Sequence, residues 1–153
     1  MSDVKEGAAA PAFDLESPEG PIRLADFEGK ALVLYFYPKD DTSGCTREAQ
    51  DFTALAADFA KAGATVVGIS KDSVASHKKF ATKYDLAVRL ASDPSGATVE
   101  RYGSWVEKSM YGRKYMGIDR STFLIQDGTL KRIWRKVKVP GHAQQVLEAA
   151  KSL

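Results

Sequence analysis

Cysteine is almost missing from this chain, since Cys45 is the only one among 153 residues. A single cysteine cannot close an internal disulfide, and it excludes every zinc site built from several thiolates. Only His77 and His142 add further imidazole ligands, so we expect no bound metal and no cofactor. Such low cysteine usage is typical of a reducing compartment, and we expect a cytoplasmic protein.

An excess of charge of one sign is also missing. The 22 Lys and Arg residues nearly balance the 20 Asp and Glu residues, for a net charge of +2, whereas nucleic-acid binding concentrates basic residues on one surface. No apolar run approaches the roughly eighteen residues that cross a bilayer, and the N-terminal MSDVKEGAAA lacks the apolar core of a signal peptide. We therefore expect a soluble protein with no nucleic-acid and no membrane partner.

What is present is an alternation of short apolar runs with amphipathic segments, which is typical of α/β proteins. The length suits one domain, and we expect residues 1–153 to form it. The predicted elements are strands over 31–37, 64–70 and 88–92, helices over about 45–63 and 73–84, a hairpin of strands 121–126 and 129–139, and a C-terminal helix from His142. We expect residues 93–119 to be largely irregular, with one short helix among glycine-punctuated loops. This order predicts a central mixed β-sheet with helices on both faces.

Cys45 lies at the start of a predicted helix, directly after the buried strand ALVLYFY and the turn-rich DDTSG. Unpaired backbone N–H groups and the positive end of the helix dipole favour an anion there. Cysteines in such settings have pKa values of about 3.5 to 7.5, compared with about 8.5 for a free thiol. The alternative is a buried structural cysteine, because free cysteine is among the most buried residue types. Position alone leaves both interpretations open.

The residues around Cys45 resemble the active-site loop of the peroxiredoxins in the pattern Pro38-x-x-x-Thr42-x-x-Cys45. More narrowly, the chain is similar to the Q-type branch, also called bacterioferritin comigratory protein. The matching segments are FYPKDDTSGCTREAQDF, GISKDSVASHKKF, KYDL, LASD, GIDRSTFLI and a late GH, in the family's order from about Ala12 to Leu147. The resemblance implies a thioredoxin-like fold and a thiol peroxidase that reduces hydrogen peroxide and organic hydroperoxides through a sulfenic acid on Cys45.

Thiolate formation alone cannot make such an enzyme fast. Lowering a thiol pKa from about 8.5 to about 6 raises the thiolate fraction at pH 7 about thirtyfold, but makes each thiolate about thirteenfold less nucleophilic. Fixed donors aimed at the peroxide oxygens must supply most of the acceleration. By resemblance, these donors are Thr42, Arg120 and the backbone N–H of Cys45, and Pro38 shields the sulfur from water. We also expect the Thr42 hydroxyl to cap the helix.

Two residues depart from the family pattern. Ser43 replaces the usual proline, which leaves the loop less rigid but still able to cap the helix. Gln50 stands where many relatives carry a resolving cysteine, and the chain has no second thiol. We therefore expect a one-cysteine cycle in which an external thiol, from thioredoxin, glutaredoxin or a small molecule, restores Cys45. Resemblance to the Q-type branch also favours a monomer.

Rival interpretations exist for the whole chain and for single residues. A disulfide reductase needs two thiols in C-x-x-C, and the segment TSGC has only the second. A peroxide sensor or redox relay would pass on the sulfenic acid without efficient turnover, and a purely structural protein would not use it. Glu48 matches a family position, but acidic residues are favourable in the first turn of any helix, so we leave it out of the catalytic set. Trp105, Met110, Tyr111 and Tyr115 could line the mouth of the pocket or simply pack on the core.

Overall fold

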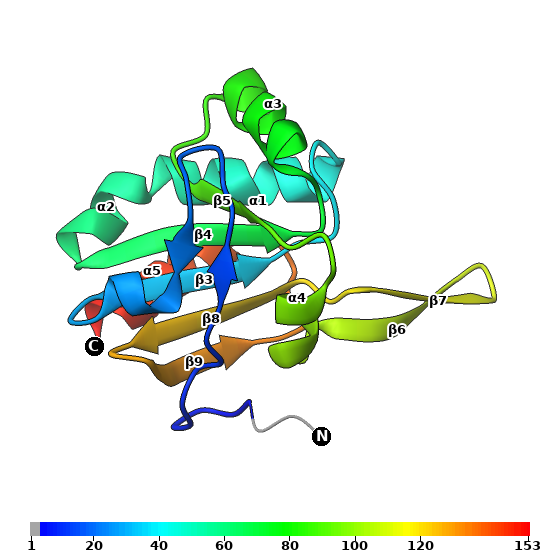
Figure 1. Cartoon of the computed structure of the whole chain (residues 1–153). Helices are drawn as coiled ribbons and strands as arrows, with labels where there is room; N and C mark the ends of the chain where they lie inside the picture. The colour runs from blue at the N-terminus through cyan, green and yellow to red at the C-terminus, as the bar shows by residue number, and fades with distance from the viewer. Residues whose placement is uncertain (1–3) are drawn as a thin grey trace.

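The computed structural model describes residues 4–153, in which a central five-stranded sheet is covered on both sides (Figure 1). The strand order is β5-β4-β3-β8-β9, with bounds β3 Ala31–Phe36, β4 Ala64–Ser70, β5 Arg89–Ser92, β8 Ser121–Gln126 and β9 Thr129–Trp134. The pairs β3–β4 and β4–β5 are parallel, whereas β3–β8 and β8–β9 are antiparallel. The predicted mixed sheet is therefore confirmed.

Strand β3 is buried on both faces, as its continuous apolar sequence predicts. Ala31, Val33 and Tyr35 belong to one core, which is closed by helices α1 Ser43–Ala54, α2 Ala56–Lys61, α3 Val74–Tyr84 and α5 His142–Lys151. Leu32, Leu34 and Phe36 belong to the other, which includes residues of the 3-10 helix η1 Leu24–Phe27, of α4 Ala97–Arg101 and of the N-terminal segment with strands β1 Asp14–Leu15 and β2 Ile22–Arg23. The central strand thus ends between two packed layers.

The helical predictions hold with shifts at their ends. The helix predicted over about 45–63 begins at Ser43 and is interrupted at Leu55, whose φ of −102° and ψ of 6° separate α1 from α2. Helix α3 begins after Ser73, whose hydroxyl accepts a hydrogen bond from the Ser76 N–H at 3.1 Å. Its buried face includes both His77 and Phe80.

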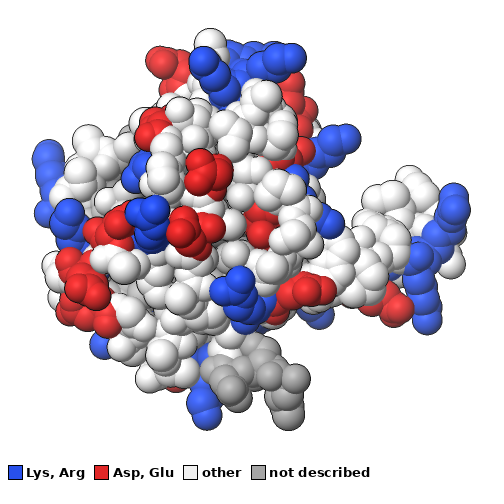
Figure 2. Space-filling view, viewed as in Figure 1, with Lys and Arg blue, Asp and Glu red and all other residues white. Residues whose placement is uncertain are grey.

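The prediction of largely irregular structure over 93–119 is wrong, apart from its short helix. This region contains α4 and an antiparallel pair, β6 Trp105–Met110 and β7 Arg113–Ile118, joined at Tyr111 and Gly112, which both have positive φ. The pair forms an arm that stands clear of the body and carries basic side chains (Figures 1 and 2). Because most of its side chains are exposed on both faces, the sequence lacks the apolar alternation that identifies a half-buried strand.

Aromatic and methionine side chains of this arm are distributed unevenly. Met110, Tyr111 and Tyr115 are exposed, whereas Trp105 is partly buried at the base, with the Lys71 ammonium 4.5 Å from its ring centroid.

None of the helices in residues 4–153 has the length and apolar character needed to cross a bilayer.

The last strand is shorter than predicted. β9 ends at Trp134 rather than near Val139, and Lys136 adopts a left-handed conformation with φ of 49°. The chain then passes Arg120, whose carbonyl oxygen accepts a hydrogen bond from the Val137 N–H at 2.9 Å. The segment after β9 therefore holds the start of β8 in place instead of extending the sheet.

Candidate active site

Cys45 is the third residue of α1 and is 1% exposed. The first bond of the helix runs from the Thr46 N–H to the Thr42 carbonyl at 2.8 Å. The N–H groups of the helical residues before Thr46 have no helical carbonyl four residues earlier to which they could donate. They therefore remain available to an anion or a polar oxygen. The predicted placement of Cys45 in the first helical turn is confirmed.

Arg120 reaches Cys45 from a different part of the chain. It lies between β7 and β8, and its Nη2 donates to Cys45 Sγ at 3.3 Å while its Nη1 donates to Glu48 Oε1 at 2.7 Å. Burial opposes the charge of the guanidinium, but Glu48 and Cys45 outweigh it, so the pKa of Arg120 is raised above its ordinary value. A permanent cation is therefore held against the only sulfur nucleophile of the chain.

Glu48 belongs to this cluster, although the sequence analysis left it out. It lies in the second turn of α1, not the first, one turn after Cys45 on the same face. Glu48 is 1% exposed, and its Oε2 has no hydrogen-bond partner among residues 4–153. Burial raises its pKa to about 7, with Arg120 acting in the opposite direction. The spacing from Cys45 was the signal that could have identified it.

Thr42 and Pro38 lie in the loop between β3 and α1. Thr42 occupies the N-cap position with extended backbone angles, but its side chain makes no cap; instead, Oγ1 donates to the Lys39 carbonyl at 2.9 Å. The predicted capping role is thus wrong, because the hydroxyl is turned back into the loop. Pro38 is exposed and follows Tyr37, whose N–H makes a further bond to the Ile69 carbonyl at 3.1 Å. Because proline lacks an N–H, Pro38 cannot continue the backbone hydrogen bonding of this segment to β4.

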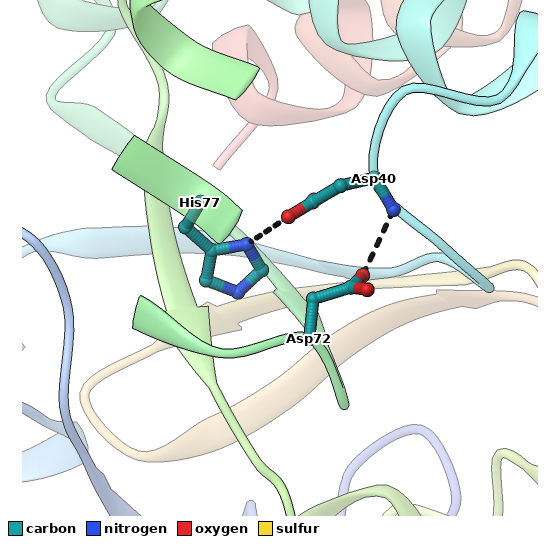
Figure 3. A group of neighbouring side chains, drawn as sticks. All are labelled: Asp40, Asp72 and His77. Carbon is teal, nitrogen blue, oxygen red and sulfur yellow. Dashed lines mark hydrogen bonds and ion pairs between the residues drawn. The ribbon is translucent and has the colours of Figure 1, made fainter. Parts of the chain in front are cut away.

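Asp40, Asp72 and His77 offer ligand atoms within 4.8 Å of one another, the grouping closest to a metal site in the described chain (Figure 3). Their polar atoms bond to one another instead. His77 Nδ1 lies 2.7 Å from Asp40 Oδ2, and Asp72 Oδ2 accepts from the Asp40 N–H at 2.8 Å. Ser70 also donates to Asp72 at 2.6 Å. These contacts account for the cluster as a hydrogen-bond network.

The other histidine, His142, packs against Phe52 of α1. His142 is 4% exposed and stacks edge-to-face on Phe52, with its Nε2 2.8 Å from Thr122 Oγ1. Burial lowers its pKa to about 4, and the charge of Arg120 acts in the same direction. His142 is therefore neutral at physiological pH and adds no second cation near Arg120.

The structure brings Cys45 and Arg120 into contact and places Thr42 at the start of the same helix, while Pro38 is an exposed residue of the loop before that helix. An arginine donor on a buried sulfur, next to free helical N–H groups, is suited to binding a small polar molecule that accepts hydrogen bonds and reacts with a thiolate. The bond from Arg120 to Glu48, which holds the guanidinium in place, could not be predicted from the sequence.

The chain is similar to known proteins over most of its length. Residues 7–133 match the model of the AhpC/TSA family. The bcp peroxiredoxin of Coxiella burnetii is 47% identical, with 94% of this chain and 97% of the relative covered. Peroxiredoxin Q of Xanthomonas campestris has 46% identity and a TM-score of 0.87, covering 92% of this chain and 90% of that one. A PrxQ mutant of Xylella fastidiosa has 38% identity and a TM-score of 0.93, covering 99% and 98%. The Xanthomonas protein has also been solved as two different cysteine-to-serine mutants, so it carries at least two cysteines.

Proposed function

This chain belongs to the AhpC/TSA family and is a thiol-dependent peroxidase of the Bcp/PrxQ type, and we propose that it completes its cycle with Cys45 alone. The observation that carries the proposal is the contact between Arg120 and Cys45 in a chain with no second thiol. The Xanthomonas relative has another cysteine, whereas here no second thiol of the chain is available, so an external thiol must attack the sulfenic acid directly.

In the first step, the Cys45 thiolate attacks one oxygen of the peroxide and the O–O bond breaks. Sulfur keeps that oxygen as a sulfenic acid, and the other oxygen leaves as hydroxide or alkoxide, which takes a proton from water. Arg120 donates to the oxygens on which charge develops, together with the Cys45 N–H. Thr42 Oγ1, whose proton is committed to Lys39, offers lone pairs to the peroxide O–H.

In the second step, an external thiol attacks the sulfur of the sulfenic acid and releases water, leaving a mixed disulfide on Cys45. Another thiol then attacks the mixed disulfide and restores the Cys45 thiolate. Thioredoxin, glutaredoxin or a small thiol can supply these electrons. Within this proposal Pro38 limits the access of water to the sulfur, and the protein acts as a cytoplasmic monomer.

The test is to add one equivalent of hydrogen peroxide and follow Cys45 by intact mass, then to measure peroxide consumption with dithiothreitol or with thioredoxin and its reductase. We expect rapid gain of one oxygen and multiple turnovers with at least one thiol, and no reaction in Cys45→Ser. Fast oxidation that stops after one equivalent with every reductant would contradict the one-cysteine cycle and favour a peroxide sensor. Size-exclusion chromatography with light scattering tests the monomer.

A further inference from the structure

The buried ring of His77 is the strongest polar feature that the peroxidase chemistry leaves unused. His77 has no exposed surface. Its Nε2 lies 3.0 Å from the Ala91 carbonyl oxygen and its Nδ1 lies 2.7 Å from Asp40 Oδ2. A carbonyl oxygen only accepts hydrogen bonds, so Nε2 carries a proton. The second nitrogen faces a carboxyl oxygen, and one more proton must lie between Nδ1 and Asp40.

The surroundings of Asp40 place that second proton on the histidine. Tyr37 Oη donates to Oδ1 at 2.6 Å and Ser76 Oγ donates to Oδ2 at 2.7 Å. Burial raises the pKa of Asp40, but the hydrogen bonds from His77 and Tyr37 more than compensate, and the pKa is lowered overall. With Tyr37 and Ser76 already donating to Asp40, the geometry makes Asp40 the acceptor and places the shared proton on His77 Nδ1. The other carboxylate nearby, Asp72, accepts from the Asp40 backbone N–H and from Ser70.

This pair joins the loop before Cys45 to a different element. Asp40 lies in the loop between β3 and α1, whereas His77 and Ser76 belong to α3 (Figure 3). The next residue, Asp41, has a left-handed φ of 59°, a conformation that costs a non-glycine residue energy and persists only when its neighbours fix it. Its carboxylate bonds to Lys83 and Tyr84, also on α3. Both aspartates thus hold one short loop against one helix.

The position of this loop decides the geometry of the reaction. Thr42 and Cys45 follow the loop directly, whereas Arg120 enters from the junction of β7 and β8. The two halves of the site are therefore carried by separate elements, and the contacts of Arg120 with Cys45 and Glu48 that join them are noncovalent. A shift of about 1 Å between reacting groups can reduce a rate about a hundredfold.

We propose that Asp40 and His77 are positioning residues for the peroxidase reaction, forming a charged clamp that fixes the loop 38–42 on α3 and so aligns Thr42 and Cys45 with Arg120. This inference rests on the proposed function. The clamp acts through the loop and touches neither peroxide nor sulfur in the reaction. Because both charges are buried, removal of either one leaves the other without its partner, and the loop loses its fixed place.

The experiment compares Asp40→Asn and His77→Asn with wild type and with Leu130→Ala, a core variant. Leu130 is fully buried on β9 in the other core, so this control loses stability without touching the clamp. The rate of Cys45 oxidation by hydrogen peroxide is measured by stopped-flow on folded protein. We expect a loss of about tenfold to a hundredfold in both clamp variants and a wild-type rate in Leu130→Ala.

Two further readouts separate positioning from general stability. In wild type at pH 7.5, nitrogen NMR should show protons on both ring nitrogens of His77, and Asp40→Asn should remove the one on Nδ1. Hydrogen exchange of residues 38–45 should accelerate in the clamp variants but not in Leu130→Ala. Ser76→Ala removes one donor to Asp40 and should cause a smaller loss of a few-fold, which keeps the proposal testable if His77→Asn does not fold.

The outcomes distinguish this proposal from the proposed function. A wild-type oxidation rate in Asp40→Asn, or a neutral His77 ring in wild type, would overturn the clamp even if the protein is an active peroxidase. If wild type itself fails to turn over with any thiol while Cys45 is still oxidised quickly, the one-cysteine cycle fails and the clamp is still judged by the oxidation rate. An equal loss of oxidation rate in Leu130→Ala would contradict the positioning role, because it would show that Asp40 and His77 contribute only to general stability.

Discussion

Asp40 and Glu48 lie on either side of Cys45 in the sequence and are both buried next to a basic side chain, yet the pKa values of their carboxyl groups shift in opposite directions. Asp40 accepts hydrogen bonds from Tyr37, Ser76 and His77, and its pKa is lowered. Glu48 accepts one, from Arg120, and its pKa is raised to about 7. Burial penalises both anions, so the difference comes from the number of donors that reach each carboxylate.

The two buried carboxyl groups are thus suited to different tasks around the Cys45 sulfur. The fully satisfied pair of Asp40 and His77 suits a rigid support, because every polar atom has a fixed partner. The pair of Glu48 and Arg120 is less satisfied, since Glu48 Oε2 is unpartnered in the described structure, and its arginine is free to direct a second N–H group at Cys45. The predictions below test this division.

The largest effect is expected from Arg120→Ala, which removes the cation from both Cys45 and Glu48. Loss of one donor to a developing oxyanion typically costs about 10² to 10³ in rate, and we expect a loss of this size in Cys45 oxidation by hydrogen peroxide. Intact mass under pseudo-first-order conditions measures it. Arg132→Ala is the control, because Arg132 is exposed on β9 and should keep the wild-type rate. An unchanged oxidation rate in Arg120→Ala would show that Arg120 takes no part in the reaction.

Glu48→Gln tests the raised pKa through the pH dependence of stability. An unfolded glutamate releases its proton near pH 4.5, whereas Glu48 in the folded protein releases it near pH 7. Between these values the folded state binds more protons, so the free energy of unfolding falls as pH rises, by at most about 3 kcal/mol. Glu48→Gln should lack this fall in urea denaturation between pH 4.5 and 8. Identical slopes in both proteins would contradict the raised pKa.

Asp40→Asn should change the same measurement with the opposite sign. The pKa of Asp40 is below its unfolded value of 3.8, so this carboxylate stabilises the fold above that pH and loses its contribution as pH falls through the folded pKa. The variant should therefore be less stable than wild type at pH 7, and the difference should shrink in acid. A difference that grows in acid would reverse the assignment of charge within the clamp.

Gly44→Ala should disturb the arginine without breaking the ion pair. A Cβ at this position would lie 3.2 Å from Arg120 Nη2, and the guanidinium cannot move away freely because it is tied to Glu48. We expect an approximately tenfold slower oxidation of Cys45, although alanine is the better helix former. Ser43→Ala, at the preceding exposed position, is the control and should react at the wild-type rate. Equal rates for both would show that Arg120 has room to shift.

The smallest effect is expected from Lys83→Ala, which removes the exposed partner of Asp41. Exposed ion pairs contribute little, because water screens both charges, and Tyr84 still bonds to Asp41. We expect oxidation of Cys45 and the denaturation midpoint to stay within error of wild type. A loss as large as that of Asp40→Asn would mean that the outer contact, not the buried pair, holds the loop.

Much of the fold could be read from local patterns. The continuous apolar runs identified the central strands, and Asp127-Gly128 marked the hairpin of β8 and β9. The arm of β6 and β7 could not be identified in this way, because its exposed strands carry no apolar alternation. The end of β9 was also misplaced, since the left-handed turn at Lys136 depends on contacts near Arg120 and not on local propensity.

The sequence by itself determined the reactive atom and its local setting: one thiol, at the start of a helix, with Thr42 three residues before it and no second thiol to resolve it. These features depend on composition and short-range spacing, which are the same in the unfolded and the folded chain. Only the tertiary structure decided that Arg120 contacts Cys45, that Glu48 is buried behind it, and that His77 meets Asp40. These contacts join residues from separate elements, and their charge states depend on burial and on donor number, which exist only once the sheet and helices have packed.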